Sequence, residues 1–221
     1  MKTLPPIKVL LALALITLFS GCGAAFKYTP SHTGSYGKSA SSGSVEILKG
    51  TDVRKGREKN GIKWNKPVQS IVANALEDEL RYAGLYSSVQ QGGTTPSGNG
   101  RSIDIQVHCL QLENVKTGGE IAGDVMLGFL GVTGGLISAA IPTKWVSNAE
   151  VDFAVSDAGG TQSVFQRRYK ATRSVSLNGY KGMSQQFRQT SEVLEDLVKQ
   201  FVSDLAGQSS GKSTGKNTKG R

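Results

Sequence analysis

The hydrophobic pattern between residues 44 and 205 changes repeatedly between two periods, and this limits the fold more than any other feature. Short stretches with apolar residues at every second position are typical of strands that bury one face. In residues 65–83 and 183–205 the apolar residues recur with helical spacing instead. The order is strand, helix, strand, strand, an apolar insert, strand, strand, helix. We therefore predict an α+β domain in which two amphipathic helices cover one face of an antiparallel or mixed sheet of four or five strands.

Individual elements carry recognisable start and stop signals. The first helix is predicted to begin at an N-cap, Asn65, with Pro67 in its first turn, and to end at Gly84. The clearest strand spans residues 103–109, where apolar and polar residues alternate strictly. On a regular strand, His108 and its neighbour Cys109 point to opposite faces.

Both ends of the chain are expected to lie outside the folded domain, which is predicted to span residues 44–207. Residues 22–43 are rich in serine and glycine and are interpreted as a flexible tether. Residues 208–221 are interpreted as a disordered basic tail. Inside the domain, residues 122–142 form a glycine-rich apolar insert, which carries no charge from Val125 to Ile141.

Residues 1–21 have the three parts of a secretory signal: lysines, an apolar run and a group of small residues. The apolar run, residues 9–19, would rise only ~16 Å as a helix, against a hydrocarbon core of about 30 Å. It is therefore a poor permanent membrane span, and we expect it to be removed on export.

Two alternatives exist for the cleavage site. The sequence Phe19-Ser20-Gly21-Cys22 resembles a bacterial lipobox, although Phe19 stands where leucine is usual. This resemblance implies that Cys22 is acylated with chains such as palmitate and becomes the new N-terminus. Because no aspartate follows Cys22, it also implies an anchor at the periplasmic face of the outer membrane. The alternative is ordinary cleavage after Ala25, which would release a soluble secreted protein.

The domain carries a second resemblance. Its order of elements, with Asp52-Val53-Arg54 after the first strand and a helix ending at Gly84, resembles that of small bacterial outer-membrane lipoproteins. The groups concerned are the YajG-like lipoproteins, the N-terminal periplasmic fold of TolB and, more loosely, LptE. The resemblance covers residues 44–206 in pattern and implies a lipid-anchored protein of envelope assembly or transport.

Motifs for catalysis are few. The segment 206–214 looks like a phosphate-binding loop, but only three residues separate Gly207 from Gly211 where the motif has four. A histidine-based triad or metal site would have to form around His108, without Cys109. We therefore predict a non-catalytic protein without a cofactor or a bound metal.

Two surfaces are predicted to contact partners. The insert has two interpretations: it covers the open face of the sheet or packs as a glycine-rich hairpin within the core, or it binds an envelope protein, a second copy or lipid. In the second case its contact residues would be Met126, Leu127, Gly128, Phe129, Leu130, Gly131, Gly134 and Gly135. The basic side offers a contact for an anionic polymer through Arg54, Lys55, Arg57, Arg167, Tyr169 and Arg173.

The leading hypothesis is an accessory or scaffold lipoprotein of outer-membrane assembly or transport, which uses the insert for a protein contact. The second hypothesis is a periplasmic module that binds lipopolysaccharide or peptidoglycan through its basic residues. The export signal makes nucleic acid an unsuitable partner for either.

Overall fold

The computed structural model describes residues 26–33, 36, 41–55, 64–97, 100–115, 143–157, 162–177 and 182–211. These residues form the elements β1 (Ser41–Ile47), β2 (Thr51–Asp52), α2 (Val68–Ala83), β3 (Tyr86–Gln91), β4 (Arg101–Val115), β5 (Thr143–Ser156), β6 (Ser163–Leu177) and α5 (Gly182–Gly211). The predicted signal, Cys22, the insert at 122–142 and Arg57 lie outside the described residues.

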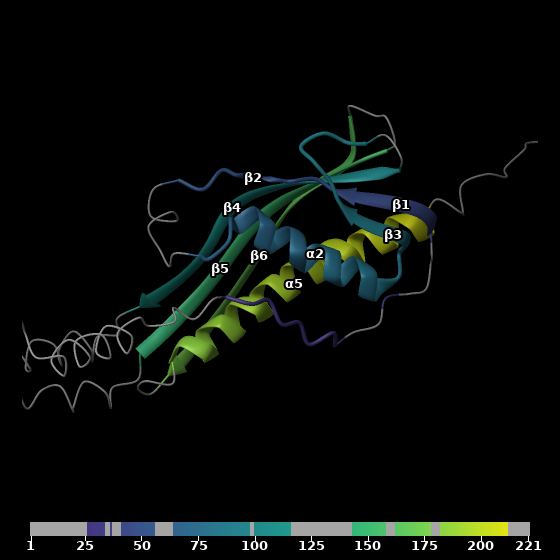
Figure 1. Cartoon of the computed structure of the whole chain (residues 1–221). Helices are drawn as coiled ribbons and strands as arrows, with labels where there is room; N and C mark the ends of the chain where they lie inside the picture. The colour runs from purple at the N-terminus through teal and green to yellow at the C-terminus, as the bar shows by residue number, and fades with distance from the viewer. Residues whose placement is uncertain are drawn as a thin grey trace, which may run out of the picture.

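The strands form one mixed sheet in the order β3-β1-β4-β5-β6, with β2 paired to β4 beyond the end of β1. Strand β1 runs parallel to both β3 and β4, whereas β4, β5 and β6 are antiparallel neighbours. Both helices lie on one face of this sheet (Figure 1). The predicted α+β fold is thus confirmed, and the additional strand is the two-residue β2.

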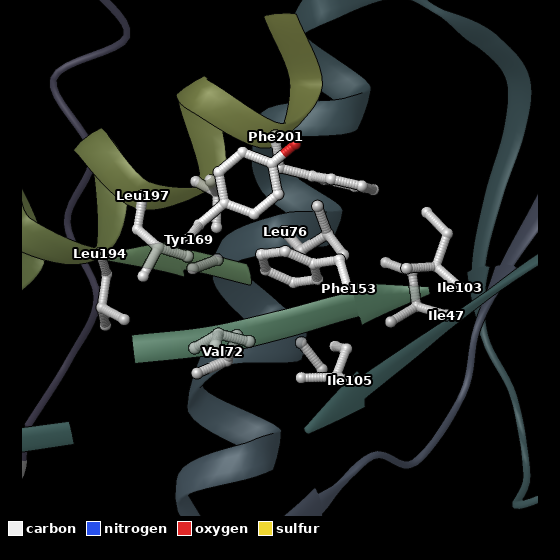
Figure 2. Close-up of a cluster of buried hydrophobic side chains, with 14 of the residues drawn as sticks. Ile47, Val72, Leu76, Ile103, Ile105, Phe153, Tyr169, Leu194, Leu197 and Phe201 are labelled. Atoms are coloured by element: carbon white, nitrogen blue, oxygen red, sulfur yellow. The ribbon is translucent and has the colours of Figure 1, made fainter. Parts of the chain in front are cut away.

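The core lies between the helices and the sheet (Figure 2). Helix α2 contributes residues such as Val72 and Leu76, and α5 contributes Leu194, Leu197 and Phe201, all with essentially no exposed surface. At the centre, the ring of Phe153 from β5 stacks on that of Phe201 with centroids 4.5 Å apart. The apolar stripes that indicated the helices are therefore the surfaces that they bury.

The start of α2 differs from the prediction. The helix begins at Val68 after an N-cap at Pro67, which makes no side-chain cap hydrogen bond, so Asn65 is not the cap. Because proline disfavours the helical conformation of the residue before it, Lys66 does not continue the helix back toward Asn65. The predicted end is confirmed: Gly84 has the left-handed conformation, φ 63°, and its N–H donates to the carbonyls of Leu80 and Arg81.

The break between β1 and β2 depends on Gly50, which has a φ of 39° and lies against β4. A Cβ at this position would stand 2.9 Å from the carbonyl oxygen of Ile105. We expect Gly50→Ala to lower the free energy of unfolding by about 1 to 3 kcal/mol through strain and crowding. Urea denaturation measures this loss. Gly84→Ala is the control, because Gly84 also has positive φ but has open space around it. An equal loss in both variants would contradict the crowding.

Among the described residues, no helix is both long enough and apolar enough to cross a bilayer.

Candidate functional site

The N-terminal segment is packed on the helices instead of forming a flexible tether. Residues 26–33 and Tyr36, which we call the N-terminal strap, cross α5 and continue toward β1 (Figure 1). The prediction of a tether over 22–43 is therefore wrong for the strap, and also at its end, since β1 already begins at Ser41. The strap and the helix surfaces that hold it form the candidate site.

Phe26 fixes the beginning of the strap. Its side chain belongs to the hydrophobic core and is 7% exposed. The ring meets Trp64 edge-on with centroids 5.2 Å apart, and Phe187 of α5 edge-on at 5.6 Å. The chain therefore enters the folded domain at Phe26, before any strand begins.

Glu195 of α5 holds the middle of the strap. This buried carboxylate accepts hydrogen bonds from the N–H of Ser31 at 2.9 Å and from its hydroxyl at 2.7 Å. Lys199, one turn further along α5, binds Glu195 and also donates to the carbonyl oxygen of Thr33 at 2.8 Å. Burial opposes ionisation of Glu195, but the hydrogen bonds from Lys199 and Ser31 outweigh it and lower the pKa of the carboxyl group.

This lowered pKa predicts how stability depends on pH. The unfolded chain binds the proton more tightly than the folded one, so the contribution of Glu195 is complete above the ordinary pKa of 4.5 and is lost as pH falls through the lower folded value. Glu195→Gln should cost about 1 to 3 kcal/mol at pH 7. Urea unfolding at pH 7 and pH 3 should show a smaller difference from the wild type at pH 3. A constant difference would contradict this prediction.

A second buried carboxylate, Glu79 of α2, lies at the end of the strap. Its side chain is completely buried and accepts a hydrogen bond from the hydroxyl of Tyr36. The ring of His32 stacks on Tyr82 at 4.5 Å and brings Nδ1 to 3.8 Å from Glu79 and Nε2 to 3.4 Å from Asp78. Burial, together with the bond to Glu79, raises the pKa of Tyr36, which keeps its phenol a neutral donor. This arrangement fastens the strap to α2.

The face of the sheet away from the helices carries a charged network. Asp152 of β5 accepts a hydrogen bond from Nε of Arg168 at 2.6 Å, and its other oxygen lies 2.8 Å from Nε2 of His108. The hydrogen bonds from Arg168, more than those from His108, lower the pKa of Asp152. Arg168 also binds Glu150 at 3.1 Å, and Lys170 binds the same carboxylate at 3.0 Å. His108 is thus a partner in a surface ion network.

The prediction that His108 and Cys109 point to opposite faces is wrong. The register between β4 and β5 shifts between Val107 and Cys109, so His108 is the extra residue of a β-bulge. Cys109 therefore stands opposite Glu150, on the same face as the ring of His108. Even so, no group of three metal-ligating side chains occurs within the described part of the chain.

The residues predicted to bind an anionic polymer divide into two groups. Arg167, Tyr169 and Arg173 do share one face of β6, but that face meets acidic residues of α5. Arg167 lies 2.7 Å from Asp204, to which Tyr169 also donates at 2.8 Å. Arg173 lies 2.8 Å from both Glu192 and Asp196.

The second group follows β2. Arg54 pairs with Asp52 at 2.9 Å, and its side chain is 11% exposed. Lys55 is exposed, and Arg57 lies outside the described residues. The structure therefore places Arg54, Arg167 and Arg173 in ion pairs within the chain. Binding of a polymer at these positions stays a prediction.

The strap was missed by sequence reasoning because serine and glycine dominate its surroundings. The signal that could have revealed it is the presence of three aromatic residues, Phe26, Tyr28 and Tyr36, in an otherwise polar stretch. Tyr28 is partly buried, and burial raises the pKa of its phenol, with Glu195 as the next cause. Flexible linkers do not need large apolar side chains.

The comparisons with known proteins identify a shared fold. No family model and no curated protein matches the chain. Protein XCC0632 from Xanthomonas campestris, assigned to the family model DUF330, superposes with a TM-score of 0.52 at 10% identity, covering 81% of this chain and 95% of its own. An identity this low shows the fold alone. At the level of the fold, the resemblance predicted from the sequence is confirmed.

Two other solved proteins are similar at TM-scores below 0.5. One is a putative lipoprotein from Caulobacter crescentus, with a TM-score of 0.42 and 13% identity over 76% of this chain and 91% of that one. The other is PelC from Paraburkholderia phytofirmans, solved as a dodecamer, with a TM-score of 0.43 and 14% identity over 78% of this chain and 94% of that one.

Proposed function

We propose that this chain is a non-catalytic lipoprotein, anchored through Cys22 to the periplasmic face of the outer membrane, that serves as an accessory or scaffold subunit in envelope assembly or transport. One observation carries the proposal: the chain enters the core at Phe26, which only three residues separate from the lipobox-like Cys22. Acyl chains on Cys22 would therefore hold the folded domain close to the membrane.

The anchor is tested by Cys22→Ser in the full chain, with Cys109→Ser as the matched control. Two or more acyl chains hold a protein on a membrane for long periods. The wild type and the control should therefore sediment with membranes and incorporate labelled fatty acid, and Cys22→Ser should do neither. Fatty acid labelling of Cys22→Ser equal to that of the wild type would overturn the proposal.

The scaffold role is tested at the uncharged insert. Its glycines have a spacing that lets two backbones approach closely. Gly131→Leu and Gly134→Leu should therefore release protein partners, or second copies, from complexes extracted in mild detergent. Gly93→Leu is the control, because no atom lies within 4 Å of a Cβ built there. Complexes of unchanged mass in the insert variants would contradict the role.

Polymer binding is the alternative function, and the ion pairs of Arg54, Arg167 and Arg173 give it less support than the anchor has. Charge reversal at Arg54, Arg57 and Arg167 should abolish any binding of lipopolysaccharide or peptidoglycan. Such binding should also weaken as salt rises, because salt screens exposed charges.

A further inference from the structure

We propose that the end of the domain that holds Phe26 docks on the surface of a bilayer containing anionic phospholipid. This inference rests on the proposed anchor at Cys22. It goes further, because an anchor on a flexible tether would leave the domain free to take any orientation.

The chain between Cys22 and Phe26 is short. Cys22 and Phe26 are separated by three residues. Even fully extended, this connection spans at most about 14 Å. Since Phe26 is buried between Trp64 and Phe187, acyl chains on Cys22 would hold this part of the domain against the lipid.

The first part of α5 and the start of β5 also lie at this end of the domain. Gln189, two residues after Phe187 in the first part of α5, donates to the carbonyl oxygen of Trp145 at 3.4 Å. Trp145 stands at the start of β5, where Lys144 pairs with Val115, the last residue of β4. Val115 and Lys144, which stand on either side of the segment that contains the uncharged insert, therefore lie at the same end of the sheet as Phe26.

Exposed lysines also lie near Phe26. Lys27 and Lys66 are exposed, and no ion pair joins either of them to an acidic residue within the described ranges. Lys27 and Lys66 line the same groove of about 370 Å³ as Phe26, and Glu77, Asp78 and Arg81 of α2 also line it. Lysines near a membrane surface are attracted to anionic headgroups, and the attraction decays within a Debye length. By contrast, the arginines of β6 discussed above are bound to carboxylates of their own chain.

The experiment compares the two ends of one hairpin. A fluorophore is attached to Lys144→Cys, at the end that holds Phe26, or to Val164→Cys, at the other end. Each variant also carries Cys109→Ser, so that no other described cysteine is labelled. Val164 is 54% exposed, and the two sites lie about 40 Å apart along the strands. The acylated protein, verified by mass, is placed in vesicles of phosphatidylethanolamine and phosphatidylglycerol that contain nitroxide-labelled lipid.

We expect lipid nitroxides to quench the label at 144 several-fold more than the label at 164. Equal quenching in a protein of acylated mass would overturn the docking and leave the anchor intact. A mass without acyl chains would overturn the proposed function and the docking together.

Charge reversal gives a second readout. Lys27→Glu combined with Lys66→Glu should reduce quenching at 144 at least twofold in the anionic vesicles and leave it unchanged in phosphatidylcholine vesicles. Lys170→Glu, on the opposite face of the sheet, is the control and should have no effect. Unchanged quenching in the double variant would overturn the role of anionic lipid.

Discussion

Replacing Phe26 by alanine is expected to lower the free energy of unfolding by about 3 to 5 kcal/mol, the usual cost of truncating a buried phenylalanine. The physical reason is that the ring is 7% exposed and fills the space between Trp64 and Phe187. Its loss removes apolar burial and leaves a cavity at the point where the strap joins the domain. Urea denaturation of the wild type and the variant at neutral pH measures the difference.

Lys27→Ala is the matched control for this change, because Lys27 is the exposed neighbour of Phe26. Its effect should stay within about 0.5 kcal/mol, as for most surface substitutions. If Phe26→Ala behaved like Lys27→Ala, the segment would be a tether after all. The docking inference would then lose its structural basis, because the anchor would no longer be tied closely to one end of the domain.

Phe153→Ala should have a comparably large effect at the centre of the core, about 3 to 5 kcal/mol. Phe153 has no exposed surface and stacks on Phe201, with Tyr169 close by at a centroid distance of 5.9 Å. Because its ring joins β5 and β6 to α5, its removal weakens the packing of helix on sheet. Thermal or urea unfolding followed by circular dichroism measures the loss.

Val164→Ala is the control for Phe153→Ala, since Val164 lies on the same hairpin but is 54% exposed. Its change should be a small fraction of that for Phe153. A loss below about 1 kcal/mol for Phe153→Ala would mean that α5 does not pack on the sheet as described.

The fold could be predicted from the sequence because the spacing of the apolar residues distinguishes its helices from its strands. The alternation at residues 103–107 and the helical stripe that includes Leu194, Leu197 and Phe201 each correspond to one buried face. Gly84 ended the first helix where expected, because a left-handed residue there costs glycine little. Local chemistry sufficed for these features.

Features that depend on distant contacts could not be predicted. The bulge at His108 changes the face of Cys109 without any glycine or proline to mark it. The strap is fastened by Glu79 and Glu195, which stand far from it in the sequence and whose helical positions alone do not indicate burial.

The ion pairs of the candidate basic surface could not be predicted either. That Arg167 and Arg173 share a face with Tyr169 followed from strand alternation. Their pairing with Asp204, Glu192 and Asp196 depends on how α5 lies across β6, which strand alternation does not determine.

The proposed anchor is an acylated Cys22 directly joined to the domain that begins at Phe26. The most direct test is the intact mass of the protein extracted gently from its native membrane. We expect a chain that begins at Cys22 and carries the added mass of acyl chains. A chain that begins at Phe26, without lipid, would contradict it, because ordinary cleavage after Ala25 would then have discarded the cysteine.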